Sequence, residues 1–354
     1  MNYRAKARSW IIAATFITFS LVASAQSESS PWHDPSPHTV QFVTVEDGVR
    51  LEVLDWGGTG RNIVLLAGSG NTAHVFDDFS QKLTRSFHVY GITRRGFGAS
   101  SHPESGYDDQ RLADDVLRVL DLGNISKPVL VGHSMAGSEM TTLGSQHSDR
   151  VAGLVYLDAG DDPDDYPGDP AYRALFDKLP PSVTSPVRAS IDERKSFQTY
   201  RDWQIRTMRF AFPESELRQR FNANPDGSVG PRRATGSISQ KIPVARMIGE
   251  GSKKRDYSRI RVPILYLPAA PPEANGWSQY YRFTPANEVE RTTLQKIYDA
   301  DRINLNRYER NMQAAAGKVH IVELRGADHY VYFTNEAAVL REVGKFMAEL
   351  RPPF

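Results

Sequence analysis

A tight turn of small residues after a short apolar run can present a serine as a nucleophile. Residues 128–131 read Pro-Val-Leu-Val, and residues 132–137 read Gly-His-Ser-Met-Ala-Gly. In such a strand-to-helix turn the serine hydroxyl projects above the sheet, and small neighbours avoid a clash between strand and helix. The usual pattern is Gly-x-Ser-x-Gly, and the alanine in the last position is still small. We therefore predict that Ser134 is a nucleophile; the alternative is that it only begins a helix.

A serine hydroxyl needs a base to become nucleophilic. The chain has nine histidines, and His329 is the predicted base. It lies in a Gly-Ala-Asp-His-Tyr segment just after the last predicted strand, so its loop can reach over the strand ends toward Ser134. His133 is expected to pack beneath the turn instead.

The base in turn needs an acid that orients its ring and stabilises the imidazolium. Asp158 ends the predicted strand 151–157 and is the favoured acid, although an aspartate there could simply cap the next turn. Glu273, in the loop after the predicted strand 262–267, is the main alternative. Asp162 and Asp301 are further candidates.

Backbone amides that stabilise a developing oxyanion are the remaining requirement for acyl transfer. Met135 directly follows the nucleophile and is predicted to supply one amide. Residues 67–71 read Ala-Gly-Ser-Gly-Asn and follow an apolar strand. Ser69 is the predicted second donor and Gly68 the alternative, since small residues let the backbone approach a ligand.

The same loop also resembles a dinucleotide-binding turn. Residues 68–73 read Gly-Ser-Gly-Asn-Thr-Ala, which fits Gly-x-Gly-x-x-Ala after a strand. Arg94 and Arg95 follow the next strand and could hold a 2′-phosphate. An NADP-binding oxidoreductase is therefore a second hypothesis, but it explains neither Ser134 nor His329.

Strands and helices alternate along the chain, which is typical of a parallel sheet with crossover helices. The expected strands are residues 41–45, 49–54, 63–66, 88–92, 129–131, 151–157, 262–267 and 319–324. The expected helices around them are residues 74–83, 111–122, 137–146, 286–316 and 336–350. The alternation stops at about residue 160, and residues 161–255 are predicted to be a mostly helical insertion, with helices at 171–179, 191–212 and 214–221 and an irregular connection at 222–231. An insertion there would cover the carboxyl ends of the strands, where open α/β sheets bind ligands.

The first residues have the pattern of a secretory signal. Three basic residues precede an apolar stretch, and Ala-Ser-Ala at 23–25 offers a cleavage site. We predict a signal peptide at residues 1–25, cleaved after Ala25, a tail at 26–39, and a secreted or periplasmic protein without a stable membrane span after cleavage. An uncleaved anchor is the alternative. The core is expected at residues 40–160 and 256–354.

Composition excludes several classes of chemistry. The formal net charge of the 354 residues is +1, which gives no electrostatic support for nucleic-acid binding. Cysteine is absent, so thiolate nucleophiles, disulfides and cysteine-bound metals are excluded.

Four segments together resemble the α/β-hydrolase fold family. They are residues 65–70, 95–100, 132–137 and 326–329, in this order, and the resemblance covers about residues 41–350. It implies a sheet of about eight strands, flanking helices, a lid and a Ser-His-Asp/Glu triad. Relatives with an aspartate nucleophile are disfavoured because position 134 is serine.

The expected function is therefore hydrolysis of a small carboxylic ester or related acyl compound. Ser134 would form an acyl-enzyme, His329 would move the proton, and Asp158 would orient His329. Neither a cofactor nor a metal is implied, and the partner is a small-molecule substrate. The same fold and triad also serve carbon–carbon bond hydrolysis and cofactor-free haloperoxidation, and a non-catalytic binding protein is a further alternative.

Overall fold

The fold was analysed in a computed structural model, which describes residues 32–160, 170–181, 187–235, 244–272 and 283–350. Contacts between Cα atoms divide the chain into Met1–Pro35 and Ser36–Phe354. The predicted signal peptide and most of the predicted tail lie outside the described residues. Everything that follows concerns the second unit.

An eight-stranded, mostly parallel sheet forms the centre of this unit, as the sequence predicts. The strand order is β1-β2-β4-β3-β5-β6-β9-β11. β1 and β2 pair antiparallel with each other, β2 pairs antiparallel with β4, and all later neighbours are parallel. The strands are β1 (Thr39–Glu46), β2 (Val49–Gly57), β3 (Asn62–Leu66), β4 (His88–Ile92), β5 (Val129–His133), β6 (Gly153–Leu157), β9 (Ile264–Leu267) and β11 (Val319–Ile321).

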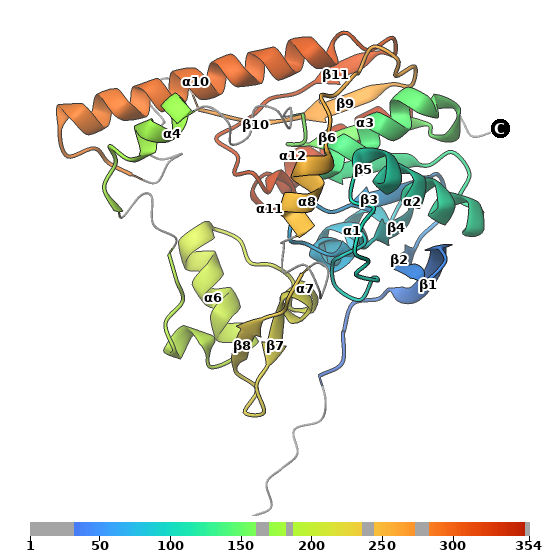
Figure 1. The fold of residues 1–354 in the computed structure, drawn as a ribbon, viewed down its shortest axis with the longest axis horizontal. Coiled ribbons are helices and arrows are strands. Elements are labelled where there is room, and N and C mark those ends of the chain that lie inside the picture. The colour runs from blue at the N-terminus through green and yellow to red at the C-terminus, as the bar shows by residue number, and fades with distance from the viewer. Residues whose placement is uncertain (1–31, 161–169, 182–186, 236–243, 273–282, 351–354) are drawn as a thin grey trace, which may run out of the picture. The chain divides into compact units, whose positions relative to one another are not determined.

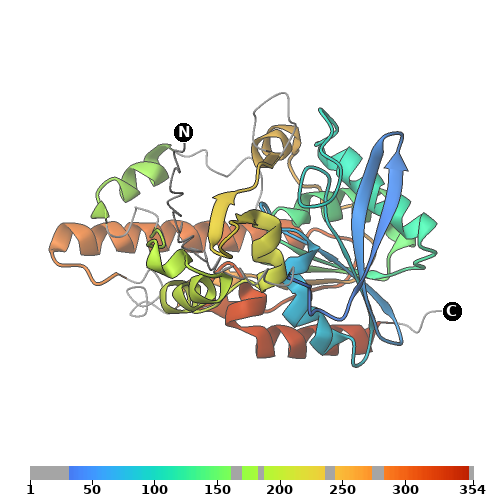
Figure 2. The same cartoon turned by 90° about the horizontal axis from the view of Figure 1, so that it is seen from below.

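Two hydrophobic cores, one on each face, hold helices against this sheet. The inner parallel strands β3, β5, β6 and β9 are mostly apolar without alternation, because both of their faces are buried. Figure 2 shows the sheet nearly edge-on, with α2 and α3 on one side and α1 and α12 on the other. The helices around the sheet are α1 (Asp77–Leu83), α2 (Asp109–Leu122), α3 (Ala136–Gln146), α10 (Glu288–Met312), α11 (Val331–Thr334) and α12 (Glu336–Glu349), with short 3-10 turns η1 (Ala73–Phe76) and η2 (Ser148–Arg150).

An insertion separates β6 from β9 and contains most of the remaining elements (Figure 1). Its described elements are α4 (Pro170–Phe176), η4 (Asp192–Arg194), α6 (Phe197–Met208), α7 (Glu214–Arg220), β7 (Phe221–Ala223), β8 (Val229–Arg232) and α8 (Val244–Gly251). A short parallel pair, β10 (Ala269–Ala270) and β12 (Leu324–Arg325), adds to the loops after β9 and β11.

Two details of the insertion differ from the sequence prediction. Residues 222–231 were expected to be an irregular connection, but β7 and β8 form an antiparallel pair there, joined by a turn in which Gly227 has φ 81°. The helix expected at 191–212 is shorter, because Ser196 caps α6 with a reciprocal hydrogen-bond pair to Thr199. α6 then ends where Arg209 adopts φ 68°.

In the part of the chain that the structure describes, no helix has both the length and the apolar character that a membrane crossing requires.

Candidate active site

Ser134 stands on a strained turn between β5 and α3. Its φ is 54°, in the left-handed region that L-residues with a side chain seldom adopt. Its amide donates to the Leu157 carbonyl at 3.2 Å. A Cβ on Gly132 would lie only 3.0 Å from the Cβ of Ala136. Because Gly132 has no side chain, the Cβ of Ala136 fits against the strand. The turn therefore keeps its geometry although alanine replaces the usual final glycine.

His329 and Asp158 form a close pair at the carboxyl ends of the strands. His329 Nδ1 lies 2.6 Å from Asp158 Oδ2, and the other oxygen, Oδ1, accepts from the Ala269 amide at 2.9 Å. Asp158 follows β6 directly and has φ 45°. A neutral ring that donates from Nδ1 to a carboxylate presents its Nε2 lone pair as a base.

The ring of His133 connects this pair to the serine turn. It lies 4.6 Å from the ring of His329, centroid to centroid, and its Nε2 donates to the His329 carbonyl at 3.0 Å. Ser134 is the next residue in the chain. Within the described residues the Ser134 hydroxyl makes no hydrogen bond. The hydrogen bond between a catalytic nucleophile and its base is often long before substrate binds and shortens in the complex.

Burial, and then the proximity of His329, lower the pKa of His133 well below its ordinary value. His133 is therefore harder to protonate in the folded chain than a free imidazole. The unfolded chain binds the proton more readily, so this residue contributes stability above its unfolded pKa, and the contribution is lost as the pH falls below it.

Replacing His133 with glutamine is accordingly expected to flatten the pH dependence of stability. Below about pH 6.5 the wild-type free energy of unfolding should fall by up to ~1.4 kcal/mol per pH unit through this one residue. Urea denaturation of both proteins at pH 7.0 and 5.5 measures the difference. An identical pH dependence in the His133→Gln variant would contradict this assignment.

Unused backbone amides lie beside Ser134. In the described part of the chain the amides of Met135, Gly68 and Ser69 donate no hydrogen bond. A Cβ on Gly68 would stand only 3.0 Å from the Cβ of Ser134, so the loop approaches the serine closely. These amides are available to an oxyanion, and the choice between Gly68 and Ser69 stays open.

A buried carboxylate from the insertion fixes the next part of this loop. Glu216 on α7 is fully buried and accepts from the Asn71 side chain at 2.8 Å. It also accepts from the Thr72 amide at 3.2 Å and the Thr72 hydroxyl at 2.6 Å. Asn71 Oδ1 accepts from the Tyr330 hydroxyl at 2.9 Å. One network thus joins the insertion, the loop after β3 and the residue after His329.

Glu216→Gln is expected to disturb this loop. The glutamine side chain has only one acceptor oxygen, and its NH2 would face groups of Asn71 and Thr72 that donate. At least one buried donor would therefore lose its acceptor, at a cost of about 1–3 kcal/mol. We expect kcat/KM for an ester to fall about tenfold or more and Tm to drop. Glu214→Gln on the same helix, whose carboxylate is half-buried and paired with Arg218, is the control. Wild-type kinetics in Glu216→Gln would contradict the positioning role.

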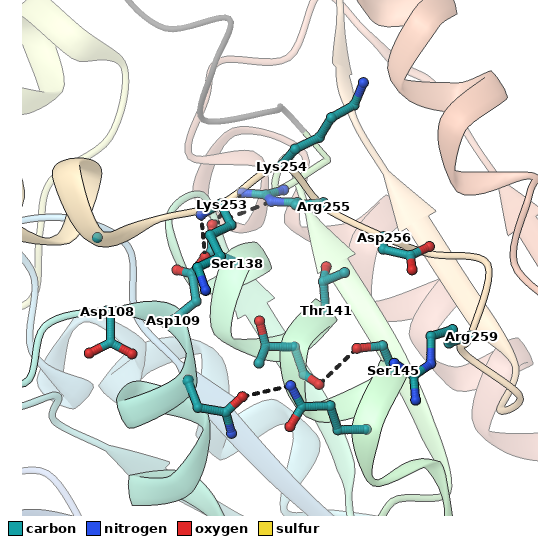
Figure 3. A pocket seen from close by; sticks show the side chains of 14 residues that line it. Asp108, Asp109, Ser138, Thr141, Ser145, Lys253, Lys254, Arg255, Asp256 and Arg259 are labelled. Atoms are coloured by element: carbon teal, nitrogen blue, oxygen red, sulfur yellow. Dashed lines mark hydrogen bonds between the residues drawn. The ribbon is translucent and has the colours of Figure 1, made fainter.

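Two cavities lie near this region. One, of about 350 Å³, is lined by His329, Asp328, Phe333 and Arg209 among others. The other, of about 220 Å³, is lined by side chains of α3, the start of α2 and residues 251–259 (Figure 3). Figure 3 shows that its polar groups bond to one another: Arg255 donates to Ser138 Oγ, while Asp109 accepts from the Lys253 amide. None of the predicted site residues lines this second cavity.

The structure thus gathers Ser134, His329, Asp158, Met135 and Ser69 at one end of the sheet. Of the alternative acids, Asp301 accepts from Tyr172 at 2.6 Å, while Glu273 and Asp162 lie outside the described residues. Sequence reasoning missed Glu216, Asn71 and Tyr330. No local pattern marks them, because their contacts join residues more than 140 positions apart.

Comparison with known proteins agrees with the fold. A profile of the alpha/beta hydrolase family matches residues 63–342, so this chain belongs to the alpha/beta hydrolase family. The crystal structure of E-2-(acetamidomethylene)succinate hydrolase superposes with a TM-score of 0.59 at 18% identity, covering 88% of this chain and 99% of that one. At that identity the likeness shows the fold alone.

Curated relatives match over shorter stretches. “Putative carbamate hydrolase RutD” of Caulobacter segnis is 32% identical over 121 residues, which cover 33% of this chain and 45% of that protein. “Epoxide hydrolase A” of Mycobacterium tuberculosis is 34% identical over 115 residues, 31% of this chain and 36% of that protein. The chain therefore spans less than half the length of these curated relatives.

Proposed function

We propose that this chain is a serine hydrolase that cleaves a small carboxylic ester or a related acyl compound. The hydrogen bond of 2.6 Å between His329 Nδ1 and Asp158 Oδ2, beside the strained Ser134 turn, carries the proposal. A pair of this kind activates a hydroxyl, and unused amides next to it suit an oxyanion. The carbamate hydrolase named among the relatives fits the wider class of acyl substrates.

The proposed reaction has two halves. Ser134 Oγ attacks the substrate carbonyl while His329 Nε2 takes its proton, and the Met135 and Ser69 amides hold the oxyanion. The tetrahedral intermediate collapses, and His329 returns the proton to the leaving alcohol. Water then attacks the acyl-enzyme with His329 again as base, releasing the acid and free Ser134. Asp158 accepts the hydrogen bond from His329 Nδ1 and stabilises the imidazolium.

The geometry favours this function over nucleotide binding. The side chain of Arg94 donates to both oxygens of Glu139, at 2.8 and 2.7 Å. Arg95 does the same with Asp115, at 2.7 and 2.8 Å. Both guanidinium groups are therefore committed to buried carboxylates rather than offered to a 2′-phosphate. Carbon–carbon bond hydrolysis and haloperoxidation would use the same triad, and no contact described above favours them.

The test is a series of 4-nitrophenyl esters from acetate to octanoate. We expect hydrolysis above the buffer rate, with a preference for short chains, and its loss in Ser134→Ala. Ser145→Ala is the matched control, because that hydroxyl only bonds to the Thr142 carbonyl on α3. Hydrolysis that survives in Ser134→Ala, or none with any ester, would overturn the proposal.

A further inference from the structure

Two arginines of the insertion are brought together by its small hairpin. Arg220 ends α7 and Arg232 ends β8. β7 pairs with β8 so that Phe221 stands opposite Arg232, and the Arg233 amide donates to the Arg220 carbonyl at 2.8 Å. The two side chains therefore start from neighbouring points of one rigid unit.

Neither guanidinium has an acidic partner in the described part of the chain. Nε and Nη1 of Arg220 are buried without a hydrogen-bond partner there, and its guanidinium carbon stands 4.6 Å above the ring of Phe212. Glu216 lies near enough to interact electrostatically with both arginines, but Asn71 and Thr72 already bond its oxygens. Burial, and then the charge of Arg220, lower the pKa of Arg232. Arg220 is half-buried and Arg232 is exposed, so two like charges stand close together, and an anion bound between them would relieve their repulsion.

These arginines lie at the oxyanion loop. Arg232 Nη2 is 3.4 Å from the position a Cβ on Gly70 would take. Gly70 directly follows Ser69, and Gly68 contacts the turn of Ser134. The Tyr330 hydroxyl, next to His329 in the chain, also lies within the electrostatic reach of both guanidinium groups. The positive charge is therefore placed beside the proposed reaction centre and not on a remote surface.

We propose that Arg220 and Arg232 form a subsite for a carboxylate of the substrate, so that the acyl compound is an anionic one, such as the monoester of a dicarboxylic acid. The proposal rests on the proposed hydrolase function. A guanidinium group is well matched to a carboxylate, and Nε and Nη1 of Arg220 are donors without a hydrogen-bond partner in the described part of the chain. A neutral acyl group of the same length would leave both cations unpaired.

The first test compares mono-4-nitrophenyl succinate with 4-nitrophenyl butyrate, two esters of equal acyl length. We expect wild-type kcat/KM to favour the succinate ester at least tenfold. Arg220→Gln and Arg232→Gln should each lower kcat/KM for that ester by about ten- to a hundredfold and change butyrate hydrolysis by less than about threefold. Arg206→Gln, an exposed arginine paired with Glu193, should leave both unchanged. Equal rates for the two esters, or equal losses on both, overturn the subsite.

A second measurement separates failure of the subsite from failure of the hydrolase function. If neither ester is hydrolysed, the proposed function fails, and calorimetric titration of the Ser134→Ala protein with sodium succinate decides on the subsite. Binding that disappears in Ser134→Ala/Arg232→Gln and persists in Ser134→Ala/Arg206→Gln supports the subsite alone. Absence of succinate binding, or binding indifferent to Arg232, removes it as well. A thermal melt of each variant verifies folding.

Discussion

Replacing Ser134 with alanine is expected to lower kcat for the best ester by about 10⁵- to 10⁶-fold, the loss typical of removing an activated serine. The reason is the geometry of the turn. The Ser134 backbone has φ 54°, and its side chain lies close to Gly68. The backbone amides would remain in Ser134→Ala, so a small residual rate above buffer is also expected. Initial rates at saturating ester, with protein at micromolar concentration, measure the effect.

The Ser134→Ala variant could also lose activity because it does not fold. Two comparisons distinguish this outcome from loss of the nucleophile. Alanine has a Cβ like serine and leaves the fully buried Ala136 and Gly132 next to it untouched, so Tm should change little. Ser145→Ala should retain the wild-type kcat. Activity of Ser134→Ala within tenfold of wild type would show that another group attacks the substrate.

Asp158→Asn is expected to lower kcat by about 10⁴-fold with little change in KM. The carboxylate accepts from His329 Nδ1 at 2.6 Å and from the Ala269 amide at 2.9 Å. An asparagine that keeps its oxygen on the Ala269 amide turns its NH2 toward His329. The ring must then carry its proton on Nε2, where it cannot accept one from Ser134.

The alternative acids provide the matched comparison. Glu273→Gln and Asp301→Asn should each keep kcat within about twofold of wild type, because Asp158 is the proposed partner of His329. Asp301 already accepts from the Tyr172 hydroxyl. A collapse of kcat in Glu273→Gln together with normal turnover in Asp158→Asn would transfer the role of the acid to Glu273.

The middle of the central sheet could be predicted from sequence because its inner strands are buried on both faces. Residues 63–66 and 129–131 are unbroken apolar runs, and β3 and β5 include them. The insertion was harder to predict. Residues 222–231 are rich in residue types typical of turns, yet β7 and β8 pair there. Two strands of three and four residues are too short to show a periodic hydrophobic pattern, so the sequence did not predict them.

The candidate site divides in the same way. Ser134, His329 and Asp158 carry local signals: a glycine-flanked turn for Ser134, a loop that follows the last predicted strand for His329, and a position directly after β6 for Asp158. Glu216 and Arg232 carry none. Their proposed roles depend on how the insertion folds back onto the loop after β3. Contacts between segments so far apart in the chain cannot be predicted from the local pattern of a single sequence.

The most direct test of the central claim, that His329 activates Ser134, is reaction with a fluorophosphonate probe followed by peptide mass spectrometry. We predict one label per chain, on Ser134, and a labelling rate at least about a hundredfold lower in His329→Ala. Labelling of another residue, or an unchanged rate on Ser134 in His329→Ala, would contradict it.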